Sequence, residues 1–447
     1  MKDNQQSPRP PLWEGTKLLG FILPAAVLCV GLLVGLCWFW RPSVSESEKR
    51  ELTKFPLPTW ETVTSGEFLD DLASGKWTDT VSLWYADTFP GREGLMGAYH
   101  SLESLFGIRS EQFVQGGPSD DIPDGPMDPT VTPDRPVSGG EDGQQVGGFY
   151  LVGHTAYELY TYSEWGAQTY ASLLNHASEL VGDKAEVYDL VIPLHYSFAL
   201  SGAVQDSKGL PDAGKAISYI YSGMQGVHTV DVYGALADHA DEYIYFRTDH
   251  HWTATGAYYA YAAYCEKAGL TPMPLSSYEK LSFDGFLGTL YSKTGEPAAM
   301  RQDPDTVEAY VPKGTNDEYI YDANGANREL YRGGVVRRDT DKFYAAAASK
   351  YNCFLMGDQP LIEIHNQNVA ADRKGTTVLL VKESFGNAFA PFLVDSYEYV
   401  YVVDYRHYNG SLSGLVESKD VDDVIFLNVI TAATGSARLS EMEDFIR

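Results

Sequence analysis

Stretches with helical spacing alternate with short apolar runs over the C-terminal two thirds of this chain, and no other feature limits the fold as much. A helical stretch at 164–181 precedes the apolar run 187–194, and a second at 213–223 precedes the run 229–232. The β-branched run 376–381 has the composition of a central strand. Because a strand buried on both faces reads as a continuous apolar run, the alternation predicts a parallel sheet covered by helices on both sides. The chain is 44% hydrophobic, which suffices for a core of that size.

Residues 18–40 contain no charged side chain. A helix of this length covers roughly 30 Å of hydrocarbon, so the run predicts one transmembrane helix. No cleavage site with small residues follows it, which makes it an uncleaved anchor. Basic residues flank both ends and do not decide the orientation. A short tail at 1–17 and a large acidic body after the anchor favour a cytoplasmic N-terminus, with the rest of the chain outside the cytoplasm.

Beyond the anchor, the composition divides the chain into three parts. Residues 41–115 carry charged and aromatic side chains at helical spacing and predict a helical region next to the membrane. Residues 116–148 are dense in Pro, Gly and Asp and poor in large apolar residues, so we predict a disordered loop. The α/β pattern occupies 149–447, and turns with short strand-like runs at about 304–340 predict a β-rich insertion in it.

The charge balance and the cysteines exclude some classes of protein. With 61 acidic and 33 basic side chains the formal net charge is -28, which opposes binding to nucleic acid. Of the cysteines, Cys29 and Cys37 fall in the apolar anchor, so that Cys265 and Cys353 remain. Because Cys265 lies on an amphipathic helical stretch, we predict two buried free thiols and no disulfide.

Residues 247–252 (RTDHHW) place a carboxylate, two imidazoles and an indole ahead of a helical stretch. In an extended segment Asp249 and His251 point to one side, while His250 and Trp252 point to the other. The Asp249 carboxylate can then fix the tautomer of His251 and stabilise its protonated form, as an orienting acid does for a catalytic base. His250, on the opposite side, is expected to pack beside Trp252 in a structural role.

Two further interpretations of this stretch concern an arginine and a metal ion. Arg247 can pair with an acidic group on a substrate or with Asp249, and the second is the simpler expectation. A metal site could combine Asp249 and either histidine with Asp358 or His365. Adjacent histidines on opposite faces of a strand do not readily share one ion, so the sequence predicts no metal and no other cofactor.

A second stretch with chemical potential follows the β-branched run. Ser384 comes just after this predicted strand, and Gly386 and Asn387 follow it as in a tight turn from a strand into a helix. Such a turn exposes the hydroxyl, and the backbone amides after it face an oxyanion that forms there. Taken alone, these residues also fit a plain helix cap. Together with Asp249 and His251 they indicate a Ser-His-Asp site.

A family resemblance rests on three strings, 247–253 (RTDHHWT), 288–291 (GTLY) and 382–389 (KESFGNAF). Together they resemble the DHHW family of bacterial surface proteins. That family is similar to the alginate O-acetylation proteins and, more distantly, to SGNH (GDSL-type) hydrolases. The resemblance extends from about residue 46 to the end, except for the Pro/Gly/Asp loop and part of the β-rich stretch. It implies an SGNH-hydrolase-like (flavodoxin-like) α/β fold with a doubly wound parallel sheet.

The resemblance also implies roles for three residues. In the alginate relatives an Asp-x-His pair precedes the serine, and the same order holds here. The resemblance therefore implies Ser384 as the nucleophile, His251 as the general base and acid, and Asp249 as the orienting carboxylate.

The donors to an oxyanion or to the substrate are less well defined. Asn387 is the nearest candidate, and Gly386 and Arg247 are two further ones. The family motif usually has aspartate before the serine, whereas this chain has Glu383, so a hydrogen bond that shapes the turn is expected to differ.

These features predict a membrane-anchored enzyme that acts outside the cytoplasm through an acyl-serine intermediate. The expected substrate is a cell-surface or secreted polysaccharide, and the acyl acceptor is water in an esterase or a sugar hydroxyl in an O-acetyltransferase. A transferase would need a multi-span membrane protein as a partner that supplies the acyl group. The alternative is a non-catalytic surface protein that binds glycan or acts as a scaffold, with Glu383 as the sign of a degenerate site.

Overall fold

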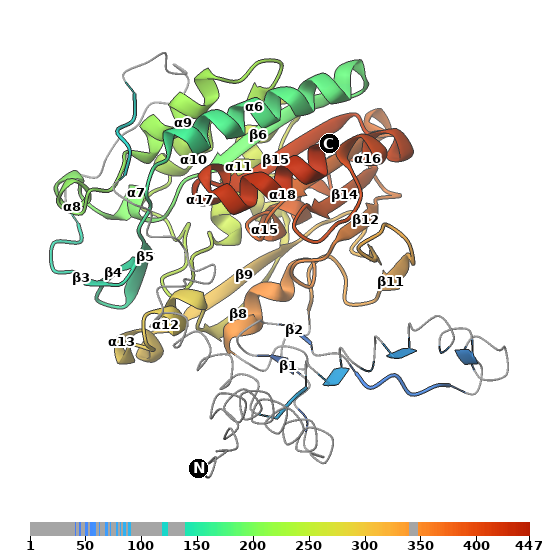
Figure 1. Ribbon diagram of the computed structural model, residues 1–447, viewed down its shortest axis with the longest axis horizontal. Coiled ribbons are helices and arrows are strands. Elements are labelled where there is room, and N and C mark those ends of the chain that lie inside the picture. The colour runs from blue at the N-terminus through green and yellow to red at the C-terminus, as the bar shows by residue number, and fades with distance from the viewer. Residues whose placement is uncertain are drawn as a thin grey trace, which may run out of the picture. The chain divides into compact units, whose positions relative to one another are not determined.

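The computed structural model describes residues 119–123, 139–338 and 347–447, together with scattered residues between 41 and 90 (Figure 1). The expected tail and anchor at 1–40 lie outside the described residues, as does most of the expected helical region and loop. Within the described part of the chain, no helix has the length and apolarity needed to cross a bilayer.

The chain divides into two compact units, Met1–Gln112 and Phe113–Arg447. In the first unit, β1 (Val44–Ser45) pairs antiparallel with β2 (Arg50–Glu51). The second unit contains all the residues proposed for chemistry.

The second unit is built on a mixed sheet, which has eight strands within the described residues. The run β14-β13-β15-β6-β7 is parallel, whereas β12, β10 and β11 are antiparallel to their neighbours. In spatial order the strands are β11 (Glu329–Tyr331), β10 (Glu318–Tyr321), β12 (Leu361–His365), β14 (Tyr399–Asp404), β13 (Thr377–Lys382), β15 (Asp423–Val429), β6 (Glu186–Ile192) and β7 (His228–Thr229).

The expectation of a wholly parallel sheet is therefore correct for one side of the sheet and wrong for the other. A parallel neighbour needs a long crossover, usually a helix, whereas an antiparallel neighbour does not. β10 and β11, which are antiparallel neighbours, are joined by residues 322–328 without a helix. The helical spacing that marks the parallel half is absent from this part of the sequence.

The stretch 304–340 is β-rich as expected, but its strands belong to two sheets. β9 (Asp305–Val311) pairs antiparallel with β8 (Glu279–Phe286) in a separate two-stranded sheet. β10 and β11 extend the main sheet, so this part of the stretch is not an insertion.

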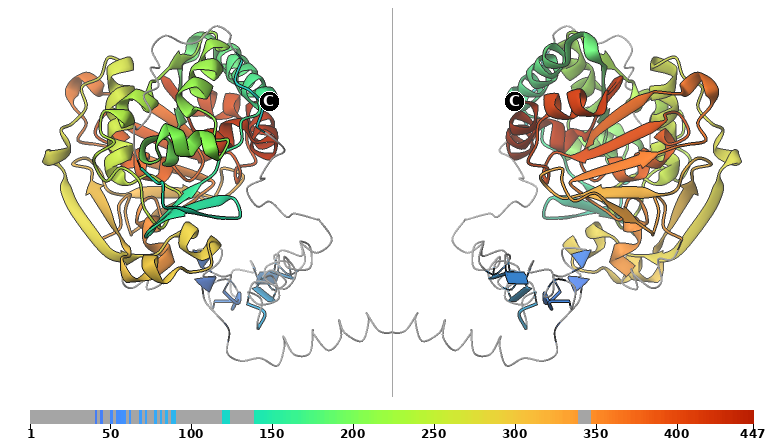
Figure 2. Two further views of the ribbon diagram at one scale, coloured as in Figure 1. Left: turned by 90° about the vertical axis from the view of Figure 1, so that its left-hand side faces the viewer. Right: turned by 90° about the vertical axis from the view of Figure 1, so that its right-hand side faces the viewer.

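Helices cover the sheet on both faces, in two groups that Figure 2 shows on opposite sides. In one group α9, α16, α17 and α18 pack against α6, and in the other α10 and α15 pack against α11. Their bounds are α6 (Glu164–Val181), α9 (Ala213–Ser222), α10 (Val232–Ala237), α11 (Ala254–Lys267), α15 (Gly386–Leu393), α16 (Leu412–Lys419), α17 (Ile430–Thr434) and α18 (Ser436–Ile446). Four further short helices are α7 (Tyr196–Ala199), α8 (Gly202–Ser207), α12 (Thr289–Lys293) and α13 (Ala298–Gln302).

A small antiparallel sheet borders the region that carries the DHHW motif. It contains β3 (Gln144–Val146), β4 (Phe149–Val152) and β5 (Thr155–Glu158). The amide of Ala156 donates a hydrogen bond to the carbonyl of Arg247 at 3.0 Å, so β5 runs beside the start of that motif.

The two elements on either side of the serine turn lie within the core. Every residue of β13 and every residue of α15 is buried. As predicted, Cys265 and Cys353 are buried free thiols. The turn between β13 and α15 is therefore fixed at both ends by packed apolar surface.

Candidate active site

Ser384 lies in the turn between the last residue of β13 and the first residue of α15, at the carboxyl end of a central parallel strand. The amide of Gly386 donates to the carbonyl of Glu383 at 2.9 Å, and the amide of Asn387 donates to the carbonyl of Ser384 at 3.2 Å. These bonds close the turn and hold the serine above the edge of the sheet, where ligands of α/β proteins commonly bind.

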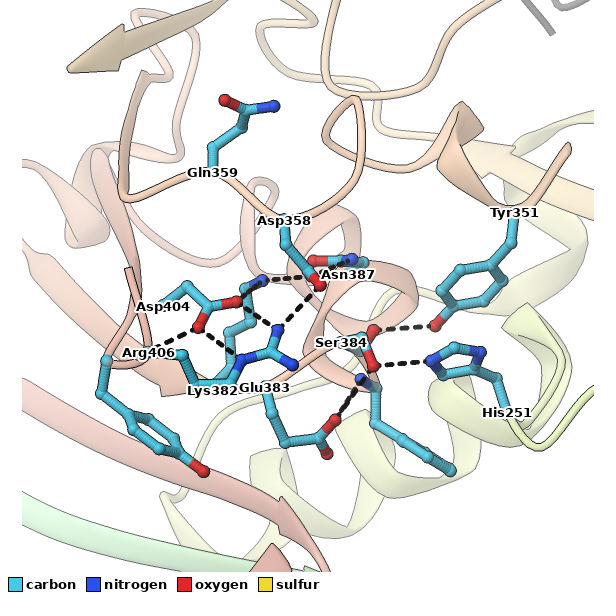
Figure 3. Close-up of polar contacts among 12 residues, drawn as sticks. His251, Tyr351, Asp358, Gln359, Lys382, Glu383, Ser384, Asn387, Asp404 and Arg406 are labelled. Carbon is cyan, nitrogen blue, oxygen red and sulfur yellow. Dashed lines mark hydrogen bonds and ion pairs between the residues drawn. The ribbon is translucent and has the colours of Figure 1, made fainter. Parts of the chain in front are cut away.

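Asp249, His251 and Ser384 form a continuous chain of hydrogen bonds. Nε2 of His251 lies 2.8 Å from Oγ of Ser384 (Figure 3). Nδ1 of the same ring lies 2.5 Å from Oδ1 of Asp249, which also accepts the backbone amide of His251 at 3.1 Å. With the proton on Nδ1 donated to the carboxylate, Nε2 is left as the acceptor for the serine hydroxyl.

Asp249 is held from its other side by the string at 288–291. Oδ2 of Asp249 accepts hydrogen bonds from the amide of Thr289 at 2.6 Å and from its hydroxyl at 3.0 Å. A Cβ atom on Gly288 would lie 2.2 Å from this oxygen, so only glycine fits there. The sequence motif contained these residues, but sequence reasoning gave them no role.

The expectation that His250 faces away from His251 is wrong. The two ring centroids are 3.9 Å apart, and Nδ1 of His250 lies 2.5 Å from Oγ1 of Thr289. The cause is local backbone geometry: Tyr245 and Trp252 form an antiparallel bridge, so the residues between them make a tight loop. Strand alternation does not apply in a loop.

Arg247 does not have the expected partner. Its guanidinium lies against Asp303 and Asp305, with Nε 3.3 Å from Oδ1 of Asp305, and its amino group donates to the carbonyl of Pro304 at 3.1 Å. Arg247 therefore connects the loop between Tyr245 and Trp252 to the start of β9 instead of pairing with Asp249.

The backbone amides after Ser384 are engaged within the turn, contrary to expectation. Besides the amides of Gly386 and Asn387, that of Phe385 donates to Oε2 of Glu383 at 3.0 Å. The side-chain amide of Asn387 donates to Oδ1 of Asp358 at 2.9 Å. The predicted oxyanion donors therefore have protein partners in this arrangement.

Glu383 connects the serine turn to the neighbouring strand. Its Oε2 lies 3.1 Å from Oγ of Ser384, and its Oε1 accepts the amide of Val429 at 3.1 Å. Glu383 is buried, and its carboxylate accepts hydrogen bonds from groups of the turn and of β15. Sequence reasoning flagged Glu383 only as a departure from the family motif.

A cluster of two cations and two carboxylates lies beside the turn (Figure 3). Nζ of Lys382 lies 2.9 Å from Oδ2 of Asp404 and 3.0 Å from Oδ1 of Asp358, and Arg406 contacts both carboxylates. Burial opposes the charge of Asp358 and Asp404, but Lys382 and Arg406 outweigh it and hold both pKa values below the ordinary value. The available sequence signal was a lysine directly after the apolar run 376–381.

One further carboxyl group belongs to the surroundings of the site. Glu158, at the end of β5, is buried, and its Oε1 has no hydrogen-bond partner. Burial raises the pKa of Glu158 to about 8; Lys293 opposes the rise, and Glu383 and Asp249 add to it. Glu158 is therefore largely protonated at neutral pH.

The structure brings together donor atoms that could bind a metal ion, but some of these atoms already have hydrogen-bond partners in the protein. Ligand atoms of Asp249, His250 and His251 lie within 4.8 Å of one another, and Asp358 groups instead with Asp404 and His407. Both ring nitrogens of His251 already contact Asp249 and Ser384. An ion in this group would have to displace one of those contacts.

Comparisons with known proteins identify a family and solved structures that this chain resembles. The family model described as DHHW protein matches residues 127–403. A DHHW family protein from Eubacterium siraeum DSM 15702 is 30% identical, with a TM-score of 0.61 over 70% of this chain and 99% of that one. Bacillus cereus PatB1 with a sulfonyl adduct is 18% identical, with a TM-score of 0.53 over 67% of this chain and 98% of that one. A further structure of the same PatB1 has a TM-score of 0.50. A comparison with curated protein sequences gives no match.

Proposed function

The chain belongs to the DHHW family, and from this premise we propose that it is an SGNH-like serine enzyme that transfers acyl groups. In this proposal it is an acyl esterase or an O-acetyltransferase of a cell-surface or secreted polysaccharide. The hydrogen-bonded chain from Asp249 through His251 to Ser384 is the observation that carries the proposal. The proposed location is the outer face of the cell membrane, with residues 18–40 as a single anchor.

The first half of the proposed reaction forms an acyl-enzyme. Oγ of Ser384 attacks the acyl carbonyl carbon while Nε2 of His251 takes the hydroxyl proton. Asp249 stabilises the resulting imidazolium through its bond to Nδ1. The proton then passes from Nε2 to the leaving alcohol oxygen, the bond between that oxygen and the carbonyl carbon breaks, and an ester on Ser384 remains.

The second half returns the enzyme to its starting state. Water in an esterase, or a sugar hydroxyl in a transferase, attacks the ester carbonyl and gives its proton to His251. The bond to Oγ breaks, and the proton returns from Nε2 to Ser384. A transferase of this kind needs an acyl donor outside the cytoplasm, which a multi-span membrane partner would supply.

A covalent probe and an activated ester test the nucleophile. Because PatB1 of Bacillus cereus has been solved with a sulfonyl adduct, we choose phenylmethanesulfonyl fluoride, which sulfonylates an activated serine oxygen and releases fluoride. We expect the mass of the sulfonyl group on the peptide that contains Ser384, and hydrolysis of p-nitrophenyl acetate by the wild type. Ser384→Ala and His251→Ala should lower that hydrolysis about a hundredfold or more.

Two variants serve as matched controls for these substitutions. Ser172 and His176 are exposed residues of α6, away from the turn, so Ser172→Ala and His176→Ala should keep wild-type rates. Equal turnover by the wild type, Ser384→Ala and His251→Ala would remove the catalytic assignment.

One observation favours a second candidate function, a non-catalytic protein that binds glycan or acts as a scaffold. The amides of Phe385, Gly386 and Asn387 are engaged in the turn, whereas an oxyanion hole needs donors directed at the reacting oxygen. For this function we expect no turnover by any variant, together with equal retention of polysaccharide by the wild type and Ser384→Ala. Sulfonylation of Ser384 in the wild type would argue against it.

A further inference from the structure

Tyr351 contacts both His251 and Ser384. Its ring lies over the imidazole of His251, with the centroids 4.1 Å apart and the planes 11° from parallel. Its hydroxyl donates a hydrogen bond to the carbonyl of Ser384 at 3.1 Å (Figure 3). We propose that Tyr351 is a positioning residue of this site, which fixes the plane of the His251 ring and favours its protonated form. This inference rests on the proposed function.

The ring of Tyr351 has little freedom to leave the imidazole. The residue is 3% exposed. Phe246 and Phe354 meet its ring edge-on, with centroid distances of 6.2 and 5.4 Å. Side chains enclosed in this way keep one rotamer, so the face that Tyr351 presents to His251 is fixed.

The backbone that carries Tyr351 is held in place by distant contacts. Leu355 and Met356 both have left-handed backbone angles, with φ of 52° and 57°, which residues other than glycine adopt only at a cost in free energy. The amide of Leu355 donates to the carbonyl of Val335 at 2.9 Å. Tertiary contacts therefore maintain this strained turn, and such strain is often found beside functional groups.

The stacked ring gives more stabilisation to one protonation state of His251 than to the other. A cation over the face of an aromatic ring is attracted by its quadrupole, whereas a neutral imidazole gains only packing. In the proposed reaction His251 is a cation only after it has taken the proton of Ser384. An interaction that forms only at that stage raises kcat and leaves KM unchanged.

The hydroxyl of Tyr351 acts on the turn itself. The carbonyl of Ser384 accepts both this hydroxyl and the amide of Asn387. Burial raises the pKa of Tyr351 well above its ordinary value, and Glu383, Asp249 and Asp358 add to the rise. The phenol of Tyr351 therefore stays protonated, and remains a donor, at and well above neutral pH.

The test uses two substitutions that separate the hydroxyl from the ring. Tyr351→Phe keeps the stacked ring and loses the hydroxyl, and Tyr351→Leu loses both. The other titratable groups around His251 stay the same in both variants: Asp249 and His250 in its own loop, and Glu383 beside Ser384. Glu158 of β5, which interacts with Asp249 and Glu383, also stays unchanged.

Two measurements on the full chain, the pH dependence of the steady-state rate and an NMR titration of His251, test the proposal. For Tyr351→Leu, kcat on p-nitrophenyl acetate should fall about tenfold with KM unchanged, and the acid limb of the rate profile should move to lower pH. For Tyr351→Phe, kcat should fall only a few-fold and the acid limb should stay in place. The NMR titration of the His251 ring should move as the rate profile does, and it requires no activity.

Tyr399 supplies a matched control. Its ring stacks on His365, with centroids 4.4 Å apart and planes 6° from parallel, at the opposite end of the parallel strands from Ser384. Tyr399→Leu should alter the titration of His365 and leave that of His251 and the rate unchanged. If folded Tyr351→Leu left the titration of His251 and kcat unchanged, the positioning role would be overturned. If the wild type lacked turnover but the His251 titration moved as expected, only the proposed function would fail.

Discussion

Oγ of Ser384 lies between two acceptors, 3.1 Å from Oε2 of Glu383 and 2.8 Å from Nε2 of His251. The hydroxyl has one proton and therefore donates to one of these acceptors at a time. When His251 is neutral, the proton can go to Nε2. When His251 is protonated, Nε2 donates to Oγ and the hydroxyl can turn toward Glu383. The two acceptors thus accommodate both protonation states of the histidine without moving the serine.

This arrangement predicts different effects for two substitutions of Glu383. In Glu383→Gln one carboxylate oxygen becomes an NH2 group that faces other donors, so we expect a loss of about 1–3 kcal/mol in the free energy of unfolding and a tenfold or larger fall in activity. Glu383→Asp keeps a charged acceptor for the amide of Phe385 but is too short to reach Val429 as well. It should lose about 1 kcal/mol of stability and keep most of the activity.

Urea unfolding and p-nitrophenyl acetate hydrolysis check both variants of Glu383. If Glu383→Gln had the same free energy of unfolding as the wild type, the hypothesis that the Glu383 carboxylate stabilises the turn would be contradicted. If Glu383→Asp were as inactive as Ser384→Ala, the aspartate of the family motif would not fit this turn.

Gly288 is predicted to be indispensable for the position of Asp249. A Cβ atom there would lie 2.2 Å from both Cβ and Oδ2 of Asp249, so Gly288→Ala must displace the carboxylate or the loop. We expect about a hundredfold loss of activity, because His251 then loses its orienting acid. Gly148→Ala is the control, since a Cβ atom at Gly148 meets nothing within 4 Å. Steady-state rates of the two variants test this prediction. Similar rates for Gly288→Ala and Gly148→Ala would argue against a steric requirement at Gly288.

Much of the parallel half of the sheet could be predicted because its signals are local. The helical spacing at 164–181 coincides with α6, and the β-branched run at 376–381 overlaps β13 (Thr377–Lys382). The sequence also predicted that Asp249, His251 and Ser384 come together, from their order along the chain and their positions in strands and loops. In the structure these three side chains are joined by hydrogen bonds. The catalytic roles of these residues remain proposals.

The remaining features depend on contacts between residues far apart in the sequence. Nothing in the composition around Tyr351 indicates that its ring lies on His251, because the intervening segments determine that contact. The loop that brings His250 beside His251 follows from the bridge between Tyr245 and Trp252, which periodicity does not reveal. Sequence patterns describe the faces of elements, and they do not describe which loops meet above a sheet.

Removing the cation at Lys382 should destabilise the fold in a pH-dependent way. The side chain is fully buried between Asp358 and Asp404, so Lys382→Met leaves two carboxylates with Arg406 as their remaining cation. We expect a loss of about 3–5 kcal/mol at pH 7. Lys280→Met, which breaks an exposed pair with Glu308, is the control and should change stability by less than about 1 kcal/mol.

The sign of the pH effect follows from the lowered pKa values of Asp358 and Asp404. Their ordinary value is 3.8, so the stabilisation is complete above that pH and is lost as the pH falls through the lower values of the folded state. The stability difference between the wild type and Lys382→Met should therefore narrow below about pH 4. Urea unfolding at a series of pH values measures it, and a constant difference down to pH 3 would contradict the assignment.

Glu158 gives the opposite pH dependence. Its pKa is raised from 4.5 to about 8 in the folded protein, chiefly by burial, so the folded state binds more protons than the unfolded state between these values. Stability should therefore fall as the pH rises from about 4.5 to about 8. In Glu158→Gln the neutral shape is kept and the ionisation is removed. This variant should match the wild type at pH 4 and exceed it by a few kcal/mol at pH 8.5 in urea unfolding. Parallel stability curves for the two proteins would show that Glu158 is ionised in the folded state and has a partner for its charge.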